Sequence, residues 1–304
     1  MLDKKGVALF LITETPLHAG SGSELGVVDL PIQRERYTGW PKVEASSFKG
    51  ALREYFDGED NEKEIIFGPE GGDLHAGAVS LTDVRLLLFP VRSGKGTFAW
   101  IISPDAYSRF RKDMEILRRT NENISIENLP EFLSPNTVSN DSQNVLEIDR
   151  RNMVLLEEYS FEVRKGDANL EEFVNWLESA LGDEIRKNEI KRRICVVDND
   201  FFNDMVQMYT EIITRIRIDR ETKTVSGTGL WNEEYLPADT IMYSMVFASK
   251  PMVKDMNSVP ENLKTAEGVL NRFLSGIPQH LFLGGNTTVG KGLVRIESFG
   301  KEEG

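Results

Sequence analysis

The sequence predicts an α+β sandwich in which strands and helices alternate along one chain. Strand-like apolar runs and amphipathic helical segments follow one another from residue 7 to residue 299. The 304 residues are 40% hydrophobic and 28% charged, which supports a real core in one large domain or one domain with insertions. No repeat or low-complexity segment interrupts the pattern, so we expect a single domain over 1–304.

The first half of the chain contains predicted elements with clear turn signals between them. Ser46 or Ser47 is expected to cap the first helix, in which Phe48, Leu52 and Phe56 recur every four residues. The turn RSGKG separates two strands. The predicted elements are a strand at 7–15, a helix at 44–56, strands at 77–91 and 97–103, and an amphipathic helix from 105 to 120.

The middle of the chain, about 105–197, is expected to be an inserted and partly helical region. Residues 121–142 are polar and interrupted by Pro130 and Pro135, which is typical of an insertion or a mobile loop. Residues 145–165 are strand-like, and a helix follows at 169–181.

A long projecting hairpin is predicted in the second half. The run EIITRIRID, 211–219, alternates between apolar residues on one face and Arg215 and Arg217 on the other. A polar turn at 220–237 with two glycines leads to a second strand at 239–249. A helix at 261–274 and a strand, glycine loop and strand at 279–299 complete the chain.

Charge and cysteine content restrict the class of protein. The net charge of −13 argues against nucleic-acid binding unless Lys and Arg are clustered, as they are between Arg34 and Arg53, at 186–194 and at 214–220. Each basic run taken alone is typical of a solvated face. Cys195 is the only cysteine, which excludes an internal disulfide and indicates a reducing cytoplasm. No segment is long and apolar enough for a membrane span, so we expect a cytoplasmic protein without a membrane partner.

The terminal loop GGNTTVGKG, 284–292, partly matches a phosphate-binding P-loop. Gly285 to Lys291 have the required spacing, but Gly292 stands where the motif needs Ser or Thr, and a strand follows instead of a helix. An NTPase is therefore not predicted. Two interpretations stay open: a loop whose backbone amides approach a phosphate closely, or a tight turn between two strands.

Two further groups of residues have both a functional and a structural interpretation. Lys49 and Arg53 lie four apart on one helix face and could contact successive phosphates, although spacing alone favours a solvated face. Asp29 ends a loop rich in Gly and Ser that begins at His18. A carboxylate there could hold Mg²⁺ or assist proton transfer, but Asp29 could also be a turn residue and His18 a polar strand end.

Three segments together resemble the RAMP superfamily. They are HAGSGSELGVVDLPIQRERYTGWPKVEASSFKGALR at 18–53, NEEYLP at 232–237 and LGGNTTVGKGLVRI at 283–296. Within that superfamily they are most similar to the repeated backbone subunit of the type III-B (Cmr) CRISPR effector complex. The resemblance implies a modified RRM-like, ferredoxin-type fold with insertions and a protruding thumb β-hairpin near 218–237. It also implies that copies of the chain stack along a CRISPR guide RNA, together with other type III-B effector subunits.

The resemblance implies a metal-dependent endoribonuclease that cleaves complementary target RNA at regular intervals, where the thumb displaces a base pair. Asp29 matches the family's catalytic acid and is the expected ligand of a divalent ion, Mg²⁺ or Mn²⁺. His18, Glu233 and Tyr235 match positions that assist. The residues expected to bind RNA are Lys42, Ser47, Lys49, Arg53, Gly284, Gly285, Asn286, Gly290, Lys291 and Gly292.

Two alternatives to target cleavage remain. The chain could be a guide-binding scaffold without cleavage activity. It could also be an endoribonuclease that processes CRISPR precursor RNA, which requires a site independent of a second RNA strand. The combination of Asp29 with a long hairpin favours target cleavage.

Overall fold

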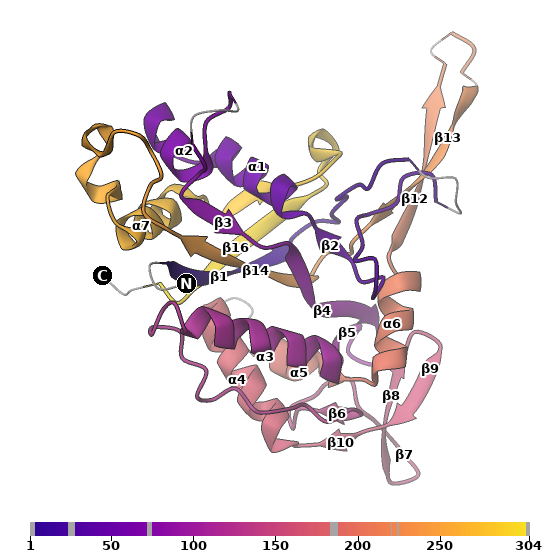
Figure 1. Ribbon diagram of the computed structural model, residues 1–304. Helices are drawn as coiled ribbons and strands as arrows, with labels where there is room; N and C mark the ends of the chain where they lie inside the picture. Colours follow the sequence, from indigo (N-terminus) through magenta and orange to yellow (C-terminus); the bar gives the residue numbers. More distant parts are fainter. Residues whose placement is uncertain are drawn as a thin grey trace.

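A computed structural model describes residues 4–23, 28–71, 75–182, 188–219, 221–223 and 225–301 of the chain. It confirms the α+β class. A large mixed sheet runs through the molecule in the order β10-β6-β11-β5-β4-β14-β1-β16-β15, with β2 added to β4 and β3 added to β14. Two groups of helices cover the sheet (Figure 1). One group is α1, α2 and α7, and the other is α3, α4 and α5.

The bounds of these elements are as follows. The strands are β1 (Lys5–Thr13), β2 (Lys42–Val43), β3 (Val79–Leu81), β4 (Val84–Arg92), β5 (Phe98–Ile102), β6 (Thr137–Val138), β10 (Arg164–Lys165), β11 (Ile194–Val196), β14 (Ile241–Ala248), β15 (His280–Phe282) and β16 (Leu293–Phe299). The helices are α1 (Ala45–Tyr55), α2 (Asp60–Phe67), α3 (Pro104–Arg118), α4 (Ala168–Leu181), α5 (Glu189–Arg193) and α7 (Ala266–Gly276).

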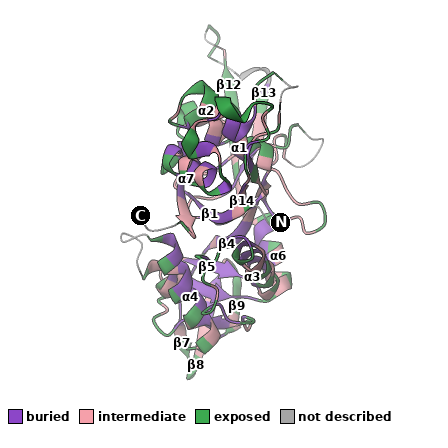
Figure 2. Ribbon diagram, turned by 60° about the vertical axis from the view of Figure 1, so that its left-hand side comes forward, coloured by how far each residue is buried: buried purple, intermediate pink, exposed green. Residues whose placement is uncertain are grey.

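β1 is an internal strand of the sheet. It pairs antiparallel with β14 on one side and with β16 on the other. Its residues from Gly6 to Thr13 are all buried, because helices lie on both faces of the sheet. This explains why the strand has a continuous apolar run rather than an alternating pattern. Figure 2 shows that the buried residues around β1 lie between the two groups of helices.

A small second sheet lies at the end of the molecule farthest from the projecting hairpin (Figure 1). It consists of β7 (Leu146–Ile148), β8 (Arg151–Leu156) and β9 (Tyr159–Glu162), paired in that order. A bridge between Ser93 and Leu156, with backbone hydrogen bonds on either side of it, joins it to the β4–β5 connection. The strand-like segment predicted at 145–165 is therefore confirmed, as a separate three-stranded sheet followed by β10.

The expected cap of the first helix is wrong. α1 begins at Ala45 with Glu44 as its N-cap, and no side chain of its own segment caps it. Ser46 and Ser47 lie inside the first turn and are exposed. Asp83 supplies the missing acceptor instead, because its Oδ1 atom accepts a hydrogen bond of 2.9 Å from the Ala45 amide. A carboxylate at this position also interacts favourably with the helix dipole.

The segment 121–142 is not a mobile surface loop. It has little regular structure, but Ile124, Leu129 and Leu133 belong to the hydrophobic core. The Asn121 side chain donates to the carbonyl groups of Gly6 and Gly300, at 2.8 and 2.9 Å. The segment is therefore held against the ends of β1 and β16, which a local polar composition does not reveal.

The predicted hairpin exists, but its second strand differs from the prediction. β12 (Glu211–Ile218) pairs antiparallel with β13 (Val225–Tyr235), which lies inside the stretch expected to be a polar turn. The segment expected as the second strand is β14, and it belongs to the main sheet. The hairpin projects from the body as a two-stranded ribbon (Figure 1). α6 (Asn199–Met208), which was not predicted, leads into it.

No helix among the described residues is long and apolar enough to cross a membrane.

Candidate active site

Asp29 lies at the base of the projecting hairpin. The residue after it, Leu30, forms a parallel bridge with Glu233 of β13. The Leu30 amide donates to the Asn232 carbonyl at 3.0 Å, and the Asn232 amide donates to Asp29 Oδ2 at 2.7 Å. Asp29 itself is exposed. The loop therefore presents one carboxylate to solvent at a position set by β13, while Gly26 of the preceding glycine-rich stretch lies outside the described residues.

Glu233 and Tyr235 form a polar cluster beside this loop. Their side chains lie on the same face of β13, and the Tyr235 hydroxyl donates to Glu233 Oε2. Arg215 of β12 donates from Nε to Glu233 Oε2 at 3.1 Å and from Nη2 to the Tyr235 hydroxyl at 3.0 Å. The indole of Trp231 donates to Glu233 Oε1 at 2.8 Å. Glu233 and Tyr235 are both buried, whereas the Arg215 side chain is partly exposed.

The ionisation of this cluster follows from its contacts. Burial opposes the charged form of Glu233, but hydrogen bonds from Tyr235, Trp231 and Arg215 outweigh it, so the pKa of Glu233 lies below its ordinary value. Burial, together with the neighbouring Glu233 carboxylate, raises the pKa of the Tyr235 hydroxyl. Glu233 is therefore a carboxylate and Tyr235 a neutral phenol at neutral pH.

His18 packs against the same cluster. Its ring lies 5.4 Å from the Tyr235 ring, and its Nδ1 atom lies 2.7 Å from the Glu234 carbonyl oxygen. Because a carbonyl only accepts, Nδ1 carries the hydrogen and Nε2 is the nitrogen left for other contacts. Gly20 lies close to that atom, since a Cβ there would be 2.8 Å from Nε2. A side chain at position 20 would thus obstruct His18.

The terminal glycine loop is a tight turn at two of its glycines, and the proposed approach of a phosphate stays a prediction. Gly284 and Gly292 have positive φ angles, and a Cβ would meet the backbone oxygens of His18 and Leu283 at 2.3 and 2.0 Å. These two glycines therefore serve a tight turn against the protein's own backbone. Gly290, with φ of 81°, has open space where a Cβ would be, and it is exposed. The amide of Gly285 donates to the His18 carbonyl at 2.9 Å, so that group is already used.

Two side chains of this loop reach the polar cluster. Asn286 donates from Nδ2 to Glu233 Oε2 at 3.0 Å and to the Tyr235 hydroxyl at 2.9 Å. Lys291 places its ammonium group 5.0 Å from the centre of the Tyr235 ring. Both residues were predicted to bind RNA. The structure gives Asn286 an internal role and leaves Lys291 at the edge of the cluster.

The predicted RNA-binding residues before and within α1 lie in a different environment. Lys42 pairs with Glu44 and Asp83 at 2.6 and 2.9 Å, and these hydrogen bonds raise its pKa. Lys49 donates to the Val79 carbonyl at 2.9 Å, and burial, with the nearby charge of Arg53, lowers its pKa.

Arg53, the other cation predicted on this helix face, also has partners within the protein. It donates to the Gly68 carbonyl and lies 3.6 Å from Glu70. Lys49 and Arg53 are therefore not simply a solvated face, as one interpretation held, because each holds the backbone of a neighbouring segment. Ser47 is exposed on the same helix.

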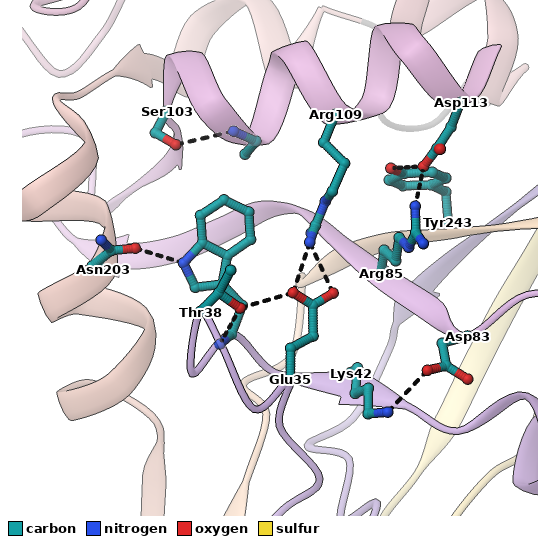
Figure 3. A network of polar contacts seen from close by, with 12 residues as sticks. Glu35, Thr38, Lys42, Asp83, Arg85, Ser103, Arg109, Asp113, Asn203 and Tyr243 are labelled. Atoms are coloured by element: carbon teal, nitrogen blue, oxygen red, sulfur yellow. Dashed lines mark hydrogen bonds and ion pairs between the residues drawn. The ribbon is translucent and has the colours of Figure 1, made fainter. Parts of the chain in front are cut away.

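Sequence reasoning missed the network that holds the segment after Asp29 (Figure 3). Glu35 pairs with Arg109 of α3 at 2.8 Å, and the indole of Trp40 donates to Asn203 of α6 at 2.6 Å. The Arg109 guanidinium also lies 4.5 Å above the Trp40 ring. Arg34 donates to Glu234, which closes the connection back to β13. The chain that leaves the active-site loop is thus fixed to two helices and to the hairpin base.

The alternation of residues in the segment NEEY, 232–235, was a pattern from which part of this arrangement could have been predicted. Period-two alternation in a strand places Glu233 and Tyr235 on one face and Glu234 on the other. Glu234 accepts from the Ile32 amide at 3.0 Å and from Thr210 at 2.7 Å, so it holds the loop from the opposite side. Arg215, by contrast, had no local signal that linked it to this site.

The residues present could hold a hydrated divalent ion but not a fully protein-coordinated one. Among the described residues, no group of three or more His, Cys, Asp or Glu side chains is arranged to hold a metal. Mg²⁺ commonly keeps several waters and binds through one or two carboxylates plus substrate phosphates. Asp29 is exposed, with Oδ2 directed at the Asn232 amide, and its donor chemistry fits that mode.

Comparison with known proteins agrees with the resemblance of the three sequence segments. The family model described as the RAMP superfamily matches residues 10–295. The CRISPR system Cmr endoribonuclease Cmr4 of Pyrococcus furiosus is 42% identical over 299 residues, which cover 96% of this chain and 95% of that protein.

Solved structures are similar over nearly the whole chain. Oligomeric Cmr4 from Pyrococcus furiosus has a TM-score of 0.73 at 31% identity, covering 97% of this chain and 98% of that one. A chain of the type III-B Cmr-beta complex bound to cognate target RNA has a TM-score of 0.74 at 20% identity, covering 96% of both chains, and is similar in fold. The protein therefore belongs to the RAMP superfamily, and within it to the Cmr4 family.

Proposed function

We propose that this protein is the repeated backbone subunit of a type III-B effector complex and cleaves RNA that is complementary to the bound guide. The observation that carries the proposal is the exposed Asp29 carboxylate, held at the base of a projecting hairpin by the Asn232 amide. The Pyrococcus furiosus relative, 95% of whose length aligns with this chain, is named an endoribonuclease. Its solved structure is oligomeric, which supports copies of this chain as partners.

The hairpin formed by β12 and β13 is proposed to be the thumb. It projects from the body (Figure 1), and Asp29 lies at its base. A ribbon in this position could separate base pairs of a guide–target duplex and leave the adjacent phosphate distorted. The part of the sheet around β1, β14 and β16, with helices on it, is the part proposed to correspond to an RRM-like core.

The chemistry needs little beyond positioning. The 2′-hydroxyl of RNA is an internal nucleophile, and a distorted linkage brings it in line with the adjacent phosphorus. Asp29 would accept the 2′-hydroxyl proton as the new P–O bond forms, and the 5′-oxygen would leave with a proton from solvent or a neighbouring group. The products would be a 2′,3′-cyclic phosphate and a 5′-hydroxyl. Lys291 at the cluster edge would supply positive charge near the phosphate.

A divalent ion, Mg²⁺ or Mn²⁺, would be held by Asp29 together with phosphate oxygens of the RNA. Bound there, it would stabilise negative charge on the phosphate. Glu233 does not fit as a second ligand, since both of its carboxylate oxygens accept hydrogen bonds from other side chains.

Guide RNA is proposed to contact the exposed part of the terminal loop. Gly290 has open space beside it, and Lys291 carries a charge there. Such a loop lets a phosphate approach backbone amides closely. Ser47 on α1 is an exposed hydroxyl that could also contact the guide. Other type III-B subunits are the remaining proposed partners.

The test compares Asp29→Asn with Asp29→Ala in complexes assembled with guide RNA. Asn keeps a side-chain oxygen for the Asn232 amide and removes the charge, whereas Ala removes both. We expect both variants to bind guide and target within about threefold of wild type and to lose most target cleavage, because the charge acts in the transition state. The cleavage ladder and the target dissociation constant are measured with Mg²⁺.

A guide-binding scaffold is the second candidate. The observation that favours it is the hydrogen bond that Asp29 already makes to the backbone, which would give the residue a structural reason to be there. Wild-type cleavage rates in Asp29→Asn, with impaired assembly in Asp29→Ala, would assign Asp29 to that structural role.

A further inference from the structure

We infer that Glu233 and Tyr235 are positioning residues, and that with Arg215 and Asn286 they form a lock between the hairpin and the terminal glycine loop. The term lock cluster is used below for these four residues. The inference rests on the proposed function of Asp29 and adds the reason why that carboxylate stands where it does. It also gives Asn286 and Arg215 a role in the reaction that they exert through other residues.

Within the lock cluster, the hydrogen-bond capacity of the Tyr235 hydroxyl and of Glu233 Oε2 is filled. Glu233 Oε2 accepts from Tyr235, Arg215 and Asn286, and Oε1 accepts from Trp231. The Tyr235 hydroxyl donates its one hydrogen to Glu233 and accepts from Arg215 and Asn286. A hydroxyl has one hydrogen and two lone pairs, so Tyr235 has nothing left to offer a substrate. Neither residue is free to act as the acid or base of the reaction.

The charges support the same conclusion. Hydrogen bonds keep Glu233 ionised despite burial, which makes it a weak base at neutral pH. Arg215 is paired with it, and the pKa of Arg215 is raised by its hydrogen bonds to Tyr235 and Glu233. This ion pair joins a buried carboxylate to a partly exposed guanidinium, and it fixes geometry because loss of a contact to Glu233 leaves a buried acceptor short of a partner.

The lock cluster is connected to Asp29 through one short stretch of β13. Trp231 and Glu233, whose side chains bond to each other, flank Asn232. The amide of Asn232 holds Asp29, and its carbonyl holds the Leu30 amide. A change in the position of Glu233 therefore moves the group to which Asp29 is bonded.

Asn286 connects this stretch to the loop proposed to contact the guide. Its backbone has φ of 63°, a left-handed conformation that Asn tolerates well, and it starts the single turn Thr287–Val289. Its carbonyl accepts from the Lys291 amide at 3.2 Å. The loop cannot shift relative to the hairpin without breaking both side-chain bonds of Asn286. The position of the terminal glycine loop is thereby coupled to the position of the Asp29 carboxylate.

The test uses Asn286→Asp and Asn286→Gly in the assembled complex, with Asn128→Asp as a matched control outside the terminal loop. Asp has the size of Asn and faces Glu233 with a negative charge in place of a donor. Gly keeps the left-handed backbone and removes the side chain. Asn128 is exposed. We expect the rate of single-turnover cleavage to fall about tenfold or more in Asn286→Asp and by less in Asn286→Gly. Both variants should still load guide RNA, and the control variant should cleave at the wild-type rate.

Two further readouts separate positioning from general damage. Lowering the pH should restore Asn286→Asp relative to wild type, because a protonated carboxyl can again donate to Glu233. Hydrogen exchange of the Asn232 region should rise in Asn286→Asp, although Asn286 does not contact Asn232.

The possible results distinguish the two proposals. A wild-type complex that loads guide and target but does not cut would refute the proposed function, and the hydrogen-exchange result would still decide the lock. A wild-type rate in both Asn286 variants, while Asp29→Asn is inactive, would overturn the lock alone. So would slower cutting with unchanged exchange around Asn232 and no recovery at low pH.

Discussion

The base and the outer part of the β12–β13 hairpin differ sharply. At the base, Arg215, Glu233 and Tyr235 exchange hydrogen bonds and the neighbouring loops are bonded to the strands. Farther out, Ile216, Ile218 and Leu230 are more than half exposed, and the strand register shifts between Ile216 and Ile218. The difference indicates that the hairpin is rigid where it holds the candidate catalytic carboxylate. Its outer part projects from the body (Figure 1).

Replacement of Glu233 by Ala should cause the largest loss of stability at the base of the hairpin. It removes the acceptor for four side chains, and Arg215, whose side chain is partly exposed, keeps only its bond to Tyr235. Loss of the acceptor of four hydrogen bonds at a buried position should cost roughly 3 kcal/mol of unfolding free energy. Urea denaturation measures this value. A loss below about 0.5 kcal/mol would mean that the base is no more tightly held than the outer hairpin.

The Lys49→Ala and Arg53→Ala double variant should have a smaller effect on stability. Each side chain holds a backbone carbonyl of a neighbouring segment, Val79 and Gly68. Loss of two such bonds should lower the unfolding free energy by about 1–3 kcal/mol. The salt dependence of guide binding, measured in the same preparations, should change little. If the slope of log K for guide binding against log salt concentration fell by about two units, both residues would instead be assigned to direct phosphate contact.

Acid should weaken the base of the hairpin before it affects the outer part. The pKa of Glu233 is lowered in the folded protein, so its stabilising contribution is fully present above the unfolded value of about 4.3 and is lost as the pH falls through the folded pKa. Glu233→Gln should therefore flatten the pH dependence of stability below about pH 4.3. Thermal melts across that range test this, with Glu221→Gln at the exposed turn as the control. Equal slopes in wild type and Glu233→Gln would contradict it.

Shortening the outer hairpin between 221 and 230 should have the smallest effect on the fold. This part carries little of the core, so the melting temperature should change by less than about 2 °C. Spacing or efficiency of target cleavage should nevertheless change if the hairpin is the thumb. An unaltered cleavage ladder at unaltered stability would exclude that role. A matched Leu230→Ser variant shows whether the exposed apolar surface alone contributes.

Local patterns were sufficient for the elements whose surroundings are simple. The buried strand at the N-terminus, the helices that became α3 and α4, and the strand after the glycine loop were all predicted from apolar spacing. The rejection of a P-loop was also confirmed, because β16 follows Gly292 where a helix would be required. The resemblance of the three segments located the family correctly.

The sequence by itself determined which residues can form each face of an element, since neighbours two to four positions apart decide that pattern. Only the tertiary structure decided what those faces meet. Asp29 and Asn232 are 203 positions apart, and no local signal predicts their bond. β13, rich in Gly and polar residues, is a strand because β12 pairs with it, and α1 receives its cap from Asp83 rather than from its own serines. Long-range hydrogen bonds, which depend on how the chain folds back on itself, turned a plausible turn residue into a carboxylate of fixed position.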